Sequence, residues 1–397
     1  MRRIIFVGLL GMMALAGTAQ DGSDLDTYLD SFESGSDDVK VEVLRRAAEE
    51  DVAREVADAD VFYVEAAQYV RDNAGQIAGS SSLREMVELV AEGTRHAEAT
   101  EALEHLWRVF EAYEEPAARV ELLSTFGALG AENDATVSLL RDWLEEQNRR
   151  EQAGERPDRE VVGAGIDAMA AISDPSFFES LFEASLTGYP SGIRERAQQA
   201  MYDLEGDIVE LAARSIGNRS AEGKLAAVEF LMTEDELNDE EKAAIAAAAI
   251  RDALSTEAPR REQADTLREV RFLAAEVISE TGYAEAEDAL ISHFNRTFLE
   301  YDRGLVTRSR VLDVIDALGT VGTEAAAERL SRFLELLNRY TENDRPYDTR
   351  IVMETINTLA EIGHPVAYNP LFYTTILDAY PSRVQNAASE ALDSLDR

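Results

Sequence analysis

The segments ISDPSFFESLFEASL (residues 172–186) and IGHPVAYNPLFYTTI (residues 362–376) decide the fold of this chain. Each begins at the end of an apolar helical stretch, turns at a Ser or Gly, passes a Pro and enters a second apolar helical stretch. Each then runs into a Tyr-Pro-Ser turn, at Tyr189 and at Tyr380. Helical hairpins that return about every forty residues are typical of α-solenoids, whose units bury their apolar faces only by stacking. The two segments therefore predict an all-α fold.

Turns between paired helices can be placed where an apolar helical stretch stops. Their spacing, 37 to 60 residues, predicts about eight stacked hairpins over residues 39–397, with extra residues between 187 and 260. In the last hairpin the helical period predicts one inward-facing stripe on each helix. These stripes are Ile351, Thr355, Ile356 and Leu359, then Tyr368, Leu371, Phe372 and Thr375. The predicted turns lie near Asp51, Gly93, Gly130, Ser173, Thr233, Gly282, Gly322 and Gly363.

Three of these hairpins resemble HEAT-like repeats of the phycobilin-lyase type, whose pattern is roughly ALGxIGDPxAxxxL. They are LAEIGHPVAYNPLF from Leu359, DALGTVGTEAAAERL from Asp316 and DAMAAISDPSFFESL from Asp167. The resemblance implies a HEAT-like or armadillo-type superhelix that binds protein, and it also brings in chromophore lyases. In that family an Asp at the turn and an Arg early in the first helix form a ladder. Asp174 matches this Asp, whereas His364 and Thr323 depart from it.

The amino terminus has the order of a bacterial secretory signal peptide. Arg2 and Arg3 precede an apolar run over residues 4–16, and residues 17–19 are Gly, Thr and Ala. The run is shorter than the ~20 apolar residues that span a bilayer. We therefore expect residues 1–19 to be cleaved, no membrane span, and a periplasmic or secreted protein.

Residues 20–38 are acidic and contain DGSDLDTYLDSFESGSDD. An EF-hand calcium loop would need a central Gly and a closing Glu at fixed spacing, and this segment lacks that spacing. We therefore expect an acidic, disordered spacer between the signal peptide and the solenoid.

The net charge of −40 bears directly on partners. Nucleic acids and anionic lipids need a cationic surface, so both are excluded as expected partners. Only three lysines accompany 35 arginines, which fits either a saline or alkaline habitat or a high-GC genome.

Residues with catalytic or metal-binding spacing are missing from the sequence. The four histidines fall in no metal-ligand pattern, and the chain has no cysteine. It contains neither a Gly-rich phosphate loop nor a GxSxG nucleophile elbow. Acidic pairs are so frequent that they indicate only solvated helix faces. We therefore expect no catalytic residues, no metal and no cofactor.

The segments that join successive hairpins carry arginine and tyrosine against the acidic trend. Helix stacking would align these joints along one edge, which we call the ridge. Arg and Tyr contribute strongly to protein interfaces, although loops also need residues that cap the next helix. The predicted partner-binding residues are Arg149, Arg150, Arg260, Arg261, Arg303, Tyr340, Arg345 and Tyr347, with Tyr373 added from a second helix.

These observations together predict a non-catalytic protein-interaction scaffold that binds a protein partner along the solenoid groove or the ridge. Two alternatives stay open at this stage. An accessory lyase-type enzyme should show a closed pocket with convergent titratable groups. A structural envelope protein that self-associates through its end repeats should show a bare apolar end.

Overall fold

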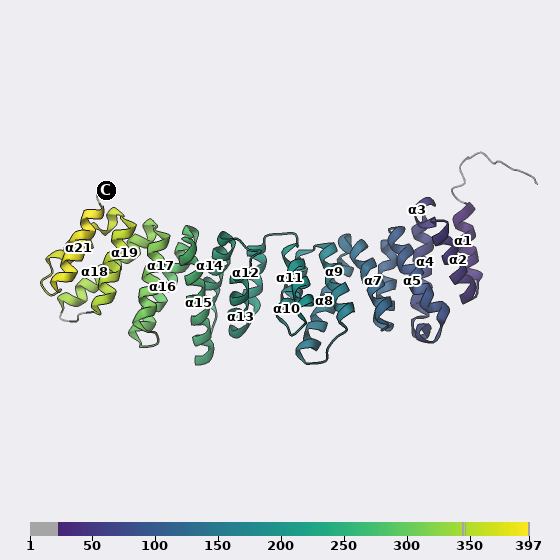
Figure 1. Ribbon diagram of the computed structural model, residues 1–397, viewed down its shortest axis with the longest axis horizontal. Helices are drawn as coiled ribbons and strands as arrows, with labels where there is room; N and C mark the ends of the chain where they lie inside the picture. The colour runs from purple at the N-terminus through teal and green to yellow at the C-terminus, as the bar shows by residue number, and fades with distance from the viewer. Residues whose placement is uncertain (1–22, 344, 346, 396–397) are drawn as a thin grey trace, which may run out of the picture. The chain divides into compact units, whose positions relative to one another are not determined.

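The computed structural model of the protein describes residues 23–343, 345 and 347–395. Every regular element among them is a helix, and most pack as antiparallel neighbours joined by short turns (Figure 1). The prediction of an all-α solenoid is confirmed. The chain divides after Glu205 into two compact units, where one continuous domain over 39–397 was expected. The signal peptide predicted at 1–19 lies outside the described residues.

The first unit is built of two helix layers. First helices of successive pairs pack side by side in one layer, and second helices pack in the other. The first-helix layer contains α2 (Asp37–Glu49), α5 (Ser81–His96), α7 (Pro116–Leu129), α9 (Arg159–Ile172) and α11 (Ser191–Tyr202). The second-helix layer contains α1 (Ser23–Ser34), α4 (Ala59–Asp72), α6 (Leu103–Ala112), α8 (Asp134–Gln152) and α10 (Phe178–Leu186). The connections include α3 (Val52–Glu55), η1 (Ala74–Gly79), η2 (Thr100–Ala102), η3 (Gly130–Glu132) and η4 (Pro175–Phe177).

The second unit repeats this two-layer arrangement. Its first-helix layer contains α13 (Ala221–Met232), α15 (Arg261–Thr281), α17 (Arg308–Val321), α19 (Thr349–Ile362) and α21 (Ser382–Leu395). Its second-helix layer contains α12 (Ile208–Asn218), α14 (Asp239–Ser255), α16 (Glu287–Asp302), α18 (Glu324–Glu342) and α20 (Tyr368–Ile376). The short helices η5 (Ala284–Ala286) and η6 (Pro365–Ala367) precede α16 and α20.

Left-handed residues end several first helices where the sequence predicted a turn. Gly282, Gly322 and Gly363 have φ of 66°, 64° and 67°, a conformation that glycine adopts at low cost. The next residue often caps the following helix. The Asp174 carboxylate accepts from the backbone N–H of Ser176 at 2.8 Å. His364 accepts in the same way in the last hairpin, so this position, which the resemblance assigned to a ladder, acts as a helix cap.

The turn predicted near Gly93 falls slightly later in the chain, because α5 continues through Gly93 to His96. Gly93 is buried, and a Cβ there would lie 1.8 Å from Cε1 of Tyr63. The glycine therefore permits close packing and does not end the helix. The long spacing between Ser173 and Thr233 also concealed structure, since residues 191–218 form α11 and α12.

The acidic segment 20–38, expected to be a disordered spacer, contains helix α1 and the start of α2. Tyr28 and Phe32 lie one helical turn apart and are buried at 7% and 1% exposure. Their rings pack edge-on against Phe62 of α4, at centroid distances of 6.0 and 5.7 Å. This aromatic contact stabilises the helix in spite of its acidic composition, because the carboxylates can occupy the opposite face.

The last hairpin confirms one predicted stripe and corrects the other. Ile351, Thr355, Ile356 and Leu359 of α19 are all fully buried. On α20, Leu371 is buried, whereas Tyr368 and Phe372, predicted to face inward, are each 48% exposed. The helical period of the apolar residues was predicted correctly, but the apolar face of α20 is wider than the portion that the neighbouring helices bury. None of the described helices is long and apolar enough to cross a membrane.

Candidate functional site

The ridge residues of the first unit pair with nearby carboxylates. Arg149 and Arg150 both lie in the last turn of α8. Arg149 contacts Glu146 at 2.7 Å and Arg150 contacts Glu155 at 2.9 Å. Arg149 also lines a small hollow of about 260 Å³ between α8 and α10. These arginines are placed for local charge pairing; Arg149 is exposed and Arg150 is half-buried.

Two joints of the second unit lie together, as the ridge hypothesis requires. The Tyr347 hydroxyl donates to Oδ1 of Asp302 at 2.7 Å, which links the joint after α18 to the joint after α16. The Tyr340 and Tyr347 rings stack with centroids 6.2 Å apart, and Tyr301 lies 6.0 Å from Tyr347. Burial first, and then the bond to Asp302, raise the pKa of the Tyr347 hydroxyl. Tyr347 is therefore mainly a packing residue between the two joints.

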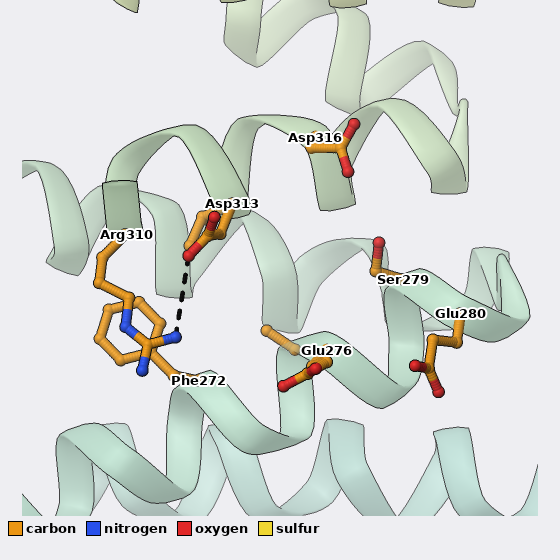
Figure 2. Close-up of a pocket in the computed structure, with 9 residues that line it drawn as sticks. Phe272, Glu276, Ser279, Glu280, Arg310, Asp313 and Asp316 are labelled. Carbon is orange, nitrogen blue, oxygen red and sulfur yellow. Dashed lines mark ion pairs between the residues drawn. The ribbon is translucent and has the colours of Figure 1, made fainter. Parts of the chain in front are cut away.

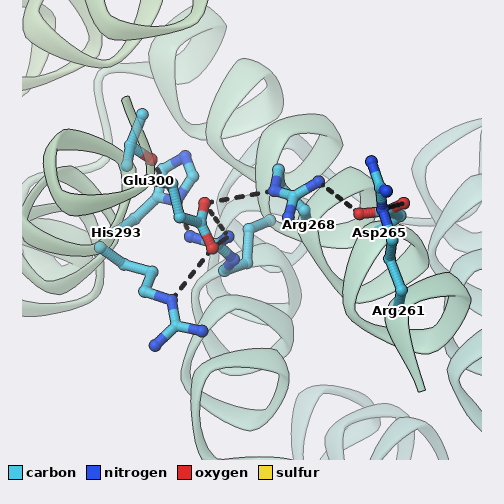
Figure 3. Close-up of polar contacts among 8 residues, drawn as sticks. Arg261, Asp265, Arg268, His293 and Glu300 are labelled. Atoms are coloured by element: carbon cyan, nitrogen blue, oxygen red, sulfur yellow. Dashed lines mark hydrogen bonds and ion pairs between the residues drawn. The ribbon is translucent and has the colours of Figure 1, made fainter. Parts of the chain in front are cut away.

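Arg261 belongs to a charge network that reaches the interior of the second unit (Figure 3). Its guanidinium lies 3.8 Å from Asp265, and Asp265 contacts Arg268 at 2.8 Å. Three arginines then converge on the carboxylate of Glu300, which is 5% exposed: Arg268, Arg271 and Arg296, at 3.3, 2.8 and 3.0 Å.

The network holds Glu300 ionised and His293 neutral. Burial alone would raise the pKa of Glu300, but Arg271 and the other arginines hold it below its usual value. Arg271 also contacts Nδ1 of His293 at 3.2 Å. Burial first, and then the charges of Arg271 and Arg310, lower the pKa of His293 well below its usual value. This cluster of titratable groups is enclosed and charge-paired, which fits a structural role.

The other ridge residues differ in their accessibility. Arg260 occupies the N-cap position of α15, and Arg303 and Arg345 lie in the joints beside the tyrosine cluster. All three are exposed and make no ion pair with any described residue. Tyr373 lies on α20, and its hydroxyl donates at 2.9 Å to Oε1 of Glu342, the last residue of α18. The structure thus brings Tyr340, Tyr347, Arg303 and Arg345 to neighbouring joints, and Tyr373 contacts the end of the helix that precedes one of them.

A second feature, which the sequence interpretation dismissed, is an acidic groove between α15 and α17 (Figure 2). It encloses about 300 Å³ and is lined by Glu276, Glu280, Asp313 and Asp316, with Phe272 at one end. Arg310 is the one cation in its lining; its guanidinium lies 4.5 Å from the Phe272 ring centroid and 3.7 Å from Asp313. In the part of the chain that the structure describes, no group of three or more His or acidic side chains is placed to hold a metal ion.

Electrostatic repulsion continues from the groove to the next helix, α19. Burial raises the pKa of Asp313; Arg310 opposes this rise, and Glu276 and Asp316 add to it. Burial likewise raises the pKa of Glu354 on α19, and Asp316 and Glu361 add to that rise. Neighbouring carboxylates therefore add to the rise that burial causes in the pKa of Asp313 and of Glu354, which is the expected effect of like charges at short range.

The first-helix layer of the first unit shows the opposite pattern. There, cations and carboxylates pair across neighbouring helices, as Arg95 of α5 does with Glu121 of α7 at 2.6 Å. The equivalent pairs are Arg45 with Glu85 and Arg196 with Asp167. In the second unit, Arg308 and Asp348 form an ion pair at 2.8 Å near the amino ends of α17 and α19. Farther along these helices, carboxylate faces carboxylate.

The sequence contains a signal for this groove. An acidic residue lies six or nine residues before most of the predicted unit turns, with Gly93 and Thr233 as exceptions. Glu121 and Asp167 occupy these positions in the first unit, and their partners are the arginines named above. In the second unit the same two positions hold Glu276, Asp313, Asp316 and Glu354. Aligning the acids on the turns, instead of counting acidic pairs, would have identified the groove.

Comparison with known proteins adds little to this geometry. No protein-family model matches the chain, and no curated protein matches it. It is similar to a solved circular tandem repeat protein with a novel repeat topology, at 16% identity and a TM-score of 0.26, over 94% of this chain and 93% of the other. It is also similar to a crystal complex of SYS-1 and POP-1, at 10% identity and a TM-score of 0.26, over 94% and 67% of the two chains. At this level of similarity, neither one indicates a partner or an activity.

Proposed function

We propose that this protein is a non-catalytic protein-binding scaffold whose acidic groove, over α15, α17 and α19, takes a cationic segment of a protein partner. The observation that carries the proposal is the arrangement of the carboxylates. Glu276 and Asp316 act on Asp313, and Asp316 acts on Glu354, where the first unit places arginines against the equivalent acids. Arg310 is the one cation in the groove lining and pairs with Asp313, so a partner's cations would lower the repulsion that remains among the other carboxylates.

The shape and chemistry of the groove favour an extended Lys- or Arg-containing segment. Packed helices lie about 8–10 Å apart, so three neighbouring helices present roughly 20 Å of surface, which an extended segment of about six residues can span. Phe272 offers an aromatic face, which Arg310 occupies in this structure. Binding by charge also predicts association that salt weakens.

The ridge is a second contact surface within the same proposed function. Arg303 and Arg345 are exposed, and they lie beside the packed tyrosines of two contacting joints. They would take an acidic part of the partner and fix its orientation relative to the groove. Replacing both with Ala should weaken capture while changing stability by only about 0.5 kcal/mol or less, as is usual for exposed loop residues.

We further propose that the protein acts in the bacterial periplasm or outside the cell. The support is the charged, apolar and small-residue order of residues 1–19. The exported protein should begin near Gln20 in amino-terminal sequencing. Retention of Met1 on material from the cytoplasm would contradict this location.

Capture from the envelope fraction of the producing cell tests the scaffold function. The bait proteins are the native chain, a groove variant (Glu276→Gln with Asp316→Asn) and a control variant (Glu257→Gln with Glu335→Gln). Both variants remove two negative charges, but Glu257 and Glu335 lie outside the groove. The proposal predicts a protein that the native chain and the control capture and the groove variant loses. Equal capture by all three would contradict it.

A further inference from the structure

Helix α20 exposes a stripe of large apolar side chains. Tyr368, Phe372 and Ile376 follow one another at four-residue spacing, which places them on one face of the helix. They are 48%, 48% and 57% exposed. The Tyr368 and Phe372 rings stack in parallel, with centroids 6.2 Å apart and an interplanar angle of 2°. We call these three residues the α20 stripe.

The segment that carries the α20 stripe contains no residue with a formal charge. Residues 362–377 contain no Asp, Glu, Lys or Arg, although such residues make up 29% of the chain. A cationic or anionic partner would find no opposite charge in this segment. In a chain with a net charge of −40, a contact between two copies through this segment brings together no carboxylate of the segment itself.

The internal repeat shows what this position does elsewhere in the protein. In the aligned segments quoted at the outset, Phe178 and Phe182 of α10 correspond to Tyr368 and Phe372. Phe178 and Phe182 are 3% and 0% exposed. The buried leucine between them, Leu181, corresponds to Leu371, which is equally buried. The stripe therefore occupies a position that is part of the core in one copy of the repeat and open in the other.

We propose that the α20 stripe is the contact surface of a symmetric homodimer, in which a second copy of the chain covers it. A two-fold axis near Phe372 would place Phe372 against its own counterpart and Tyr368 against Ile376 of the other copy, as a self-complementary surface requires. A head-to-tail contact with α1 is disfavoured, because α1 exposes Asp26 and Asp30. Burial of aromatic and aliphatic area drives such a contact without any need for charge.

Sedimentation velocity over a concentration series tests this dimer. The native chain should approach twice the monomer mass as its concentration rises, and Phe372→Glu should stay at the monomer mass. Leu299→Glu is the matched control, because Leu299 is 51% exposed on α16 outside the stripe, and it should dimerise like the native chain. Circular dichroism should show equal helicity in all three proteins. A native chain that stays monomeric, or a Phe372→Glu variant that still dimerises, would overturn the proposal.

The absence of cysteine from the chain allows a direct test of the two-fold geometry. Mild oxidation should cross-link Phe372→Cys to its own counterpart and leave Leu299→Cys uncross-linked. A dimer without the cross-link at residue 372 would contradict the two-fold arrangement.

Salt separates this proposal from the acidic groove. Screening of the negative charge on the two chains should raise the dimer fraction, whereas salt should weaken binding of a cationic segment. The groove substitutions leave the stripe intact, so either proposal can fail without the other.

Discussion

At the scale of single residues, Lys40 and Lys224 have the same function in different helix pairs. The ammonium of Lys224 donates to the carbonyls of Ile216 and Gly217 at 2.9 and 2.8 Å, near the end of α12. Lys40 donates to the equivalent carbonyls at the end of α1, seven and eight residues earlier in the chain. Both lysines are nearly fully buried. Each satisfies carbonyls that a helix end leaves without partners.

Replacing Lys224 with Met should therefore destabilise the second unit. The change leaves two carbonyls and the carboxylate of Asp252, 2.7 Å from the ammonium, without their donor. An unmet buried polar group costs about 1–3 kcal/mol, which should lower the melting temperature measured by circular dichroism. Lys242→Met, at the third lysine, serves as the control and should have little effect. Equal melting temperatures for both variants would refute the capping role.

The buried His293 should make stability depend on pH. Its pKa is lowered in the folded protein, so the unfolded state binds more protons at and below the ordinary histidine value of about 6.5. The stability that the protein gains while His293 is neutral in both states is complete above roughly pH 6.5. It is lost as the pH falls toward the lower pKa of His293 in the folded protein. The slope approaches about 1.4 kcal/mol per pH unit for one proton. The free energy of unfolding, measured in urea between the folded and the unfolded pKa of this histidine, should depend less steeply on pH in His293→Gln than in the native protein. Identical slopes of unfolding free energy against pH would contradict this.

At the scale of helices, glycine explains both a success and a failure of prediction from sequence. Gly282, Gly322 and Gly363 end helices because they adopt positive φ, and the periodic pattern stops there as well. Gly93 instead lies within the last turn of α5, where it makes room for the ring of Tyr63. A sequence shows a glycine but not which of these two properties the fold uses. The α20 stripe shows a similar limit of prediction from sequence. The helical period indicates which residues share one face of α20, but not how much of that face the neighbouring helices cover.

Substitution of Gly93 by Ala tests the packing role. Alanine is the better helix former by about 1 kcal/mol, but its Cβ would overlap the ring of Tyr63. Overpacking of this kind costs about 1–3 kcal/mol, so a lower melting temperature is expected. Gly192→Ala, in α11 of the same unit, meets no atom within 4 Å and should be neutral or stabilising. A Gly93→Ala protein as stable as the Gly192→Ala protein would contradict the contact.

At the scale of the whole molecule, composition predicted the charge of the surface but not its arrangement. The net charge and the repeats indicated an acidic solenoid that binds protein. The groove depends on which side chain of the neighbouring helix lies opposite each carboxylate. Glu121 pairs with Arg95 in the first unit, whereas Asp313 lies near Glu276 in the second. The residue that the neighbouring helix presents decides that difference. Two of the joints assigned to the ridge lie in contact, and the packing role of Tyr347 could be recognised only from its bond to Asp302.

The most direct test of the central claim is the affinity of the groove for a defined cationic segment. The probe is a fluorescein-labelled peptide of alternating Lys and Gly, titrated with native protein, with Glu276→Gln/Asp316→Asn and with Glu257→Gln/Glu335→Gln, and followed by fluorescence anisotropy at low and moderate salt. We expect the groove variant to bind about tenfold more weakly, a loss of about 1.4 kcal/mol, and the control to bind like native protein. Equal weakening in the two variants would show that the peptide responds to net charge alone, and would contradict a binding site in the groove.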